Sequence, residues 1–243
     1  TQAQDLARDH PQKLHELQRL WLIEATRYNV LPLDDRFAER ANPEIAGRPQ
    51  LIKGTRQVLF GGMGRLSESS IVNFKNKSHA ITAEVVVPPE GAEGVIIAQG
   101  GLTGGWSLYA REGKPKYCYN FYGVHRYTVA GTATIPPGTH QVRMEFAYDG
   151  GGLAKGGTVT LYVDGQKAGE GRVDQTEPMV FSADETCDVG FEAGSPVTDD
   201  YPTAGGTFSG EVNWVEIDVD KDAEDLDHLI SPEERLRLAM ALQ

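Results

Sequence analysis

The chain has 243 residues, of which 40% are hydrophobic, so it is long enough for one large domain with appended segments. Its formal net charge is −12, and no run of Lys or Arg forms the concentrated basic face that nucleic acids and anionic membranes attract. No apolar run approaches the roughly 18 residues that span a bilayer. We therefore expect neither nucleic acid nor a membrane as a partner.

The N-terminal segment has the pattern of one amphipathic helix. Pro11 suits the first helical position, and Pro32 prevents a long continuation. Because the apolar stripe contains large aromatic side chains, we expect it to dock on the following domain or on a partner domain. Residues 1–54 are predicted to be this helix and an irregular tether. The stripe consists of Leu14, Leu17, Trp21, Ala25 and Tyr28.

The next segment, residues 55–220, has the pattern of an antiparallel β-sandwich. Short runs of β-branched and aromatic residues alternate with clusters of Gly, Pro and Asp, and no helical period separates them. Asp164-Gly165 joins two such runs and predicts a type I′ hairpin, since both residues tolerate positive φ. Six strands are expected within Ala80–Val87, Gly94–Gln99, Trp106–Ala110, Lys116–Tyr122, His140–Tyr148 and Thr158–Val163.

The C-terminal part is predicted to complete the sandwich. Phe181–Phe191 is acidic and strand-like, Gly194–Gly206 is expected to be a long loop, and Phe208–Val219 to be the last strand. In that strand, either Trp214 or Val215 is expected to point inward. Residues 221–243 are predicted to be an acidic connector and a short C-terminal helix.

Residue patterns typical of enzymes are absent from this sequence. The six histidines show no paired metal spacing, and neither cysteine lies in a Cys-x-x-Cys motif. Cys118 and Cys187 are interpreted as two buried thiols rather than a disulfide. The sequence therefore predicts no catalytic residue and no cofactor-binding residue.

Two weaker binding patterns remain. Asp199 and Asp200 are calcium candidates, because Ca²⁺ takes carboxylate oxygens from loops, although a solvated acidic loop is the favoured interpretation. Trp106, Tyr119 and Tyr122 are candidates for stacking on a sugar, although strand aromatics more often belong to the core. The alternation in Glu216-Ile-Asp-Val-Asp220 also resembles the acidic strand of laminarinase-type glycosidases. Because Lys221 stands where that pattern has its second glutamate, we expect a solvent-facing strand edge instead.

Several phrases in order resemble the C-terminal region of bacterial arylsulfatases, and the resemblance extends over nearly the whole chain. They are His10–Leu14, Asn29–Asp35, Lys75–Glu84, Gly94–Gly101, Gly105–Tyr109, Tyr117–Phe121 and Met144–Gly152.

The resemblance implies a concanavalin A-like or jelly-roll sandwich that belongs to a larger enzyme. In that family, a formylglycine made within Cys/Ser-x-Pro-x-Arg acts beside a divalent cation, usually Ca²⁺, in the catalytic core. Neither Cys118 nor Cys187 lies in such a motif, so no catalytic residue carries over. The implied function is an accessory one: the chain would stabilise the sulfatase catalytic domain of the same parent chain, and border its substrate entrance or an oligomer interface. A calcium-dependent carbohydrate-binding module is the alternative. The localisation stays open between cytoplasm and periplasm.

Overall fold

The computed structural model describes residues 4–33, 35–36, 38–47, 49–201 and 206–219, and the chain divides into two compact units, Thr1–Phe37 and Ala38–Gln243. The first unit contains the predicted helix, α1 (Pro11–Arg27). Asn29 follows it at a φ of 54°, a left-handed conformation that closes helices. Among the described residues, no helix is long and apolar enough to cross a membrane. The C-terminal helix predicted within 221–243 lies outside the described residues.

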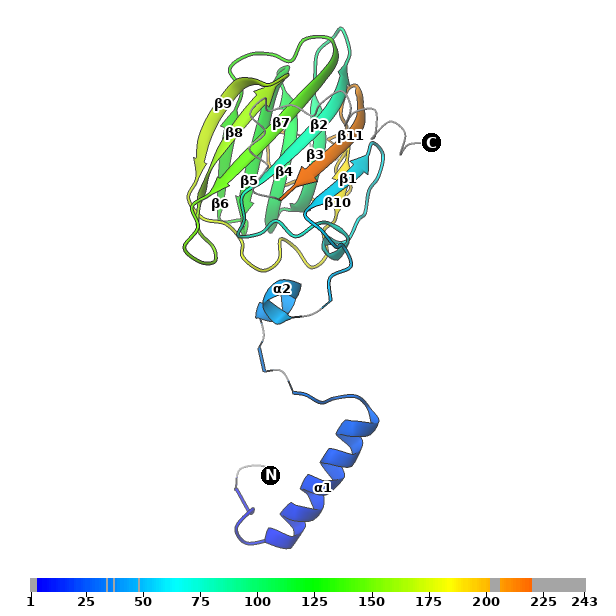
Figure 1. The fold of residues 1–243 in the computed structure, drawn as a ribbon, viewed down its shortest axis with the longest axis vertical. Helices are drawn as coiled ribbons and strands as arrows, with labels where there is room; N and C mark the ends of the chain where they lie inside the picture. Colours follow the sequence, from blue (N-terminus) through cyan, green and yellow to red (C-terminus); the bar gives the residue numbers. More distant parts are fainter. Residues whose placement is uncertain (1–3, 34, 37, 48, 202–205, 220–243) are drawn as a thin grey trace. The chain divides into compact units, whose positions relative to one another are not determined.

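The second unit confirms the predicted antiparallel β-sandwich (Figure 1). One sheet has six strands in the order β1-β11-β2-β7-β8-β9, and the other has five in the order β10-β3-β4-β5-β6. Every pairing between these strands is antiparallel. The strands are β1 (Arg56–Phe60), β2 (His79–Val87), β3 (Gly94–Gly101), β4 (Gly104–Arg111), β5 (Lys114–Phe121), β6 (His125–Ala130), β7 (Gly138–Tyr148), β8 (Gly157–Val163), β9 (Gln166–Val173), β10 (Cys187–Val189) and β11 (Glu211–Asp218).

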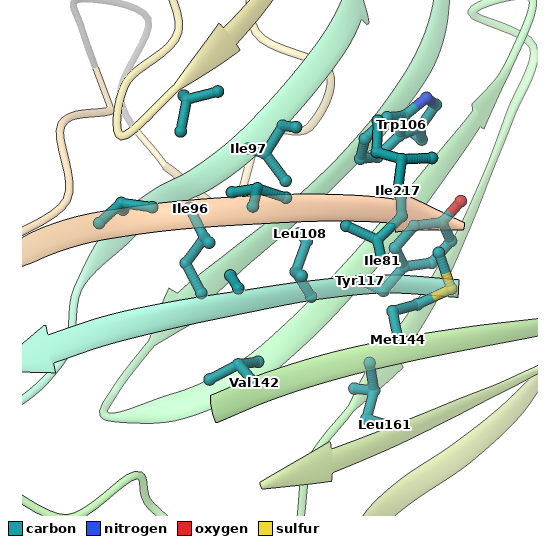
Figure 2. Close-up of a cluster of buried hydrophobic side chains, with 14 of the residues drawn as sticks. Ile81, Ile96, Ile97, Trp106, Leu108, Tyr117, Val142, Met144, Leu161 and Ile217 are labelled. Atoms are coloured by element: carbon teal, nitrogen blue, oxygen red, sulfur yellow. The ribbon is translucent and has the colours of Figure 1, made fainter. Parts of the chain in front are cut away.

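The core lies between the facing surfaces of the two sheets. Ile81 and Met144 reach it from the six-stranded sheet, and Ile96, Leu108 and Tyr117 reach it from the other sheet (Figure 2). All five side chains are fully buried, which fits the alternation of inward and outward residues along a strand. Cys118 and Cys187 are buried free thiols, as predicted.

The hairpin between β8 and β9 has the predicted turn. Asp164 and Gly165 have φ values of 48° and 75°, and the strands pair directly on either side of them. A type I′ turn requires positive φ at both central residues, and its twist matches that of the strands it joins.

The structure corrects the prediction at three strands. The strand β6 was not predicted, and within Phe181–Phe191 only Cys187–Val189 forms a strand. In β11, the pairing with β2 shifts register between Val212 and Trp214. Because of this bulge, Trp214 lies outside the main core while Val215 lies within it.

Short helical turns lie in the segments that flank β1. The tether carries a 3-10 helix, η1 (Ala38–Ala41), and a short helix, α2 (Pro43–Ala46), while η2 (Glu68–Ser70) lies between β1 and β2. Asn42 caps α2 by accepting a hydrogen bond from the Glu44 N–H at 3.1 Å. The Asn42 amide also donates to the Pro178 carbonyl at 3.1 Å, which attaches the tether to the loop after β9.

Candidate functional site

A groove of about 640 Å³ is formed where the tether meets two loops of the sandwich. This volume lies within the roughly 300–1,000 Å³ that is usual for small-molecule sites. Ten of its eighteen lining residues are polar or charged, and Leu51 adds an apolar side chain that is 74% exposed. We call this space the tether groove. It is lined by Ala41, Pro43, Pro49, Gln50, Leu51, Ile52, Ser67, Glu68, Ser69, Ile71, Asn73, Lys75, Val180, Ser182, Ala183, Asp184, Glu185 and Thr186.

An ion pair fixes one wall of the tether groove. Lys75 Nζ lies 2.5 Å from Glu68 Oε1 and 4.7 Å from the centroid of the Phe181 ring. The second carboxylate oxygen of Glu68 accepts from the Phe181 N–H at 2.9 Å. The Lys75 and Glu68 side chains are only 7% and 16% exposed, so the pair is held in a set geometry.

On the loop before β10, the Glu185 carboxylate is also held in place by its neighbours. Glu185 Oε1 accepts from the Ser195 hydroxyl at 2.6 Å. A Cβ atom at Gly194 would clash with this carboxylate, so the loop backbone approaches it closely. The neighbouring Asp184 is exposed, and among the described residues its one hydrogen bond runs from its N–H to the Ser182 hydroxyl, at 3.3 Å.

The opposite wall of the tether groove belongs to the tether. Asn73 donates from its amide to Asn42 Oδ1 at 3.3 Å, and Asn42 itself is 1% exposed. Lys77 Nζ also contacts Glu44 Oε1 at 2.5 Å. These contacts hold the tether beside the sandwich, so the two walls of the tether groove keep a defined separation.

A second, much smaller cavity of about 10 Å³ lies between the ends of the sheets. Its lining includes His79 and Glu177, both buried. Burial lowers the pKa of His79 to about 4 and raises that of Glu177 to about 8. The cavity is too small for a sugar, so it does not compete with the tether groove as a ligand site.

The predicted sugar-stacking group is not assembled. Trp106 is 0% exposed and Tyr119 is 5% exposed, because both belong to the main core. The Trp106 indole N–H donates to Gln99 Oε1 at 3.2 Å, so its polar edge is also satisfied internally. Tyr122 alone is exposed, at 46%, and it does not line the tether groove. The stacking hypothesis is therefore wrong for Trp106 and Tyr119.

The two calcium candidates contact cationic side chains instead of facing one another. Asp200 Oδ2 lies 2.7 Å from Lys116 Nζ and accepts from the Tyr109 hydroxyl at 2.6 Å. Asp199 Oδ2 lies 3.3 Å from an Arg126 nitrogen. Within the described part of the chain, no group of three or more His, Cys, Asp or Glu side chains has a metal-binding arrangement.

The outward face of the six-stranded sheet carries the acidic residues of β11. Glu216 and Asp218 point to the same side, as the alternation predicts, and both lie near Arg56, at 3.6 and 2.6 Å. The predicted solvent-facing edge is wrong, because β11 lies between β1 and β2 and these side chains are 5% and 7% exposed. The two carboxylates thus share one guanidinium, which hydrogen-bonds Asp218 and offsets part of the negative charge of Glu216.

Sequence reasoning missed the tether groove. Ser67–Ser70 and the acidic run from Asp184 were visible as polar loops, but they are separated by more than a hundred residues. These loops form one groove only when the tether packs beside both of them, and no local sequence pattern predicts that packing.

No protein-family model and no curated protein sequence matches this chain. Solved structures resemble it in fold. The CBM40 module of the Ruminococcus gnavus IT-sialidase, bound to α2,3-sialyllactose, is 14% identical over 79% of this chain and 98% of that one, with a TM-score of 0.46. The LG4-5 domains of the mouse laminin α1 chain are 18% identical over 69% of this chain and 41% of that one, with a TM-score of 0.40. Neither likeness indicates what this chain binds.

Proposed function

We propose that the sandwich is a carbohydrate-binding module and that the sugar binds in the tether groove. The observation that carries this proposal is the convergence of hydroxyl, amide, carboxylate and ammonium groups on one space of about 640 Å³. Sugars offer several hydroxyl groups, each of which donates and accepts hydrogen bonds, and a wall of fixed polar groups matches them. Exposed Leu51 provides a surface for the apolar C–H face of a sugar ring.

Isothermal titration calorimetry against a panel of oligosaccharides tests this proposal. Ser69 is exposed and lines the tether groove, so Ser69→Trp fills the space without touching the core. Glu90→Trp is the matched control, because Glu90 is exposed in the turn between β2 and β3 and does not line the tether groove. We expect the wild type and the control to bind and Ser69→Trp to lose binding. Absence of binding to every sugar would reject the proposal.

We also propose an accessory role in which α1 docks the module on a partner domain. The helix exposes large apolar side chains, with Leu17 at 50% and Trp21 at 45%, and its C-cap residue Tyr28 is 66% exposed. Large apolar side chains that are exposed close together are typical of a protein–protein interface. The resemblance to the C-terminal region of arylsulfatases implies that the partner is the sulfatase catalytic domain.

Co-expression with a bacterial arylsulfatase catalytic domain, followed by size-exclusion chromatography, tests the accessory role. The wild type should co-elute with that domain, and the double variant Leu17→Ser, Trp21→Ser should elute separately. Gln12→Ser, on the polar side of the same helix, serves as the control and should leave the complex intact. If the double variant still co-elutes, α1 is not the docking element.

A further inference from the structure

The tether groove carries an excess of negative charge. Among the described residues that line it, the charged side chains are three carboxylates, on Glu68, Asp184 and Glu185, and one ammonium, on Lys75, which gives a formal net charge of −2. The field of this groove therefore opposes an anionic ligand and favours a cationic one.

The three carboxylates differ in whether a protein side chain already pairs or hydrogen-bonds with them. Glu68 is paired with Lys75, and Glu185 accepts hydrogen bonds from Ser195. In the described residues, no cationic side chain lies within ion-pairing distance of Asp184. Asp184 is thus the carboxylate of the tether groove that is open to a cation supplied by a ligand.

The position of Asp184 is set by its neighbours. The Ser182 hydroxyl accepts from the N–H groups of both Asp184 and Glu185, at 3.3 and 3.0 Å. Ser182 in turn follows Phe181, whose N–H donates to the ion-paired Glu68. The exposed carboxylate therefore projects from a loop whose backbone is tied to the wall of the tether groove, which limits the entropy lost when a ligand binds.

We propose that the tether groove selects an amino sugar with a free ammonium group, that Asp184 pairs with this group, and that sulfated and sialylated sugars are rejected. This inference rests on the proposed carbohydrate-binding function and names the class of its ligand. An exposed charge pair contributes modestly, so the selectivity is expected to be several-fold rather than many orders of magnitude.

Calorimetric titration with three matched oligosaccharides tests the inference: a glucosamine tetrasaccharide, its fully N-acetylated form and its sulfated form. We expect the glucosamine oligomer to bind about three- to ten-fold more tightly than the N-acetylated one, and the sulfated one most weakly. The advantage should shrink at high salt, because exposed charges are screened.

Two variants test whether Asp184 causes the preference for the glucosamine oligomer. Asp184→Asn keeps the size of the side chain and should remove the advantage of the glucosamine oligomer, whereas Glu90→Gln removes a carboxylate elsewhere and should change nothing. Equal affinity for all three sugars, tightest binding of the sulfated form, or an unchanged preference in Asp184→Asn would overturn the inference while leaving carbohydrate binding in place. Failure of every sugar to bind would overturn both proposals together.

Discussion

The individual aromatic residues of the sandwich differ in role according to their burial. Trp106 is fully buried and contacts Phe74 at 5.5 Å and Tyr117 at 6.4 Å between ring centroids. Tyr122 lies in the turn after β5 and is 46% exposed. One residue therefore supports the core, while the other is exposed at the surface.

Trp106→Ala is expected to destabilise the whole sandwich. Truncating a fully buried tryptophan leaves a cavity and costs roughly 3–5 kcal/mol of unfolding free energy. Tyr122→Ala should cost less than about 1 kcal/mol, because exposed substitutions have small effects. Urea unfolding followed by circular dichroism measures both values. Similar stabilities for the two variants would contradict the placement of Trp106 in the core.

The buried Glu177 should make stability depend on pH. Its pKa is about 8 in the folded protein and 4.5 ordinarily, so between these values the folded state retains a proton that the unfolded state has lost. Stability therefore falls as pH rises through this range, by about 1.4 kcal/mol for each unit of pKa shift. His79, whose pKa is lowered, acts in the opposite direction and costs stability as pH falls from 6.5 towards about 4.

Glu177→Gln isolates the contribution of this carboxyl group. The amide is isosteric with the protonated acid and cannot ionise, and its oxygen can still accept from the Tyr122 N–H, which lies 2.6 Å from Glu177 Oε1. The unfolding free energy of the variant minus that of the wild type should rise by on the order of a few kcal/mol from pH 5 to pH 8.5. Chemical denaturation at both pH values gives the difference. Parallel curves for the two proteins would show that Glu177 is not held protonated.

At the scale of elements, the loop before β11 is fastened to the outer face of the five-stranded sheet. Val197 and Tyr201 pack on Tyr109 and Cys118, and Asp200 joins Lys116 and Tyr109. Burial opposes ionisation of Asp200, but the hydrogen bonds from Lys116 and Tyr109 outweigh it and lower the pKa. The loop is therefore held by apolar packing and by the ion pair between Asp200 and Lys116.

Asp200→Asn is expected to loosen this loop while leaving the sandwich folded. The substitution removes the charge that Lys116 pairs with, so the opening free energy should drop by about 1 kcal/mol, or roughly five-fold in amide exchange. Amide hydrogen exchange in the segment 195–201 measures this opening free energy. Since Lys116 already occupies the carboxylate, millimolar Ca²⁺ should leave the wild-type exchange unchanged; protection by Ca²⁺ would restore the calcium interpretation.

Local chemistry explains which elements could be predicted. The hairpin at Asp164-Gly165 and the helix starting at Pro11 depend on neighbouring residues alone, and both were confirmed. The inward position of Val215 depends on a bulge that arises only when β11 pairs with β2, and the strand β6 follows a turn without a strong local signal. The tether groove depends on three distant segments, so the sequence revealed its polar loops but not the site.

At the scale of the whole molecule, the two units have separate structural bases. The main core of the sandwich draws its residues from Leu59 to Ile217, all of which belong to the second unit. In the first unit, Ala25 is the one buried apolar residue among those described. The packing energy that resists unfolding thus resides in the second unit.

A chain reduced to residues 38–243 should therefore fold by itself. Its thermal midpoint is expected to lie within a few degrees of that of the whole chain, since the shortened chain keeps every residue of the main core. Differential scanning calorimetry of both chains makes the comparison. The truncated chain should also be less prone to associate, because α1 exposes Leu17, Trp21 and Ile23 to solvent. A large loss of the thermal midpoint would show instead that α1 packs on the sandwich, and α1 would then be part of its fold rather than a surface for a partner.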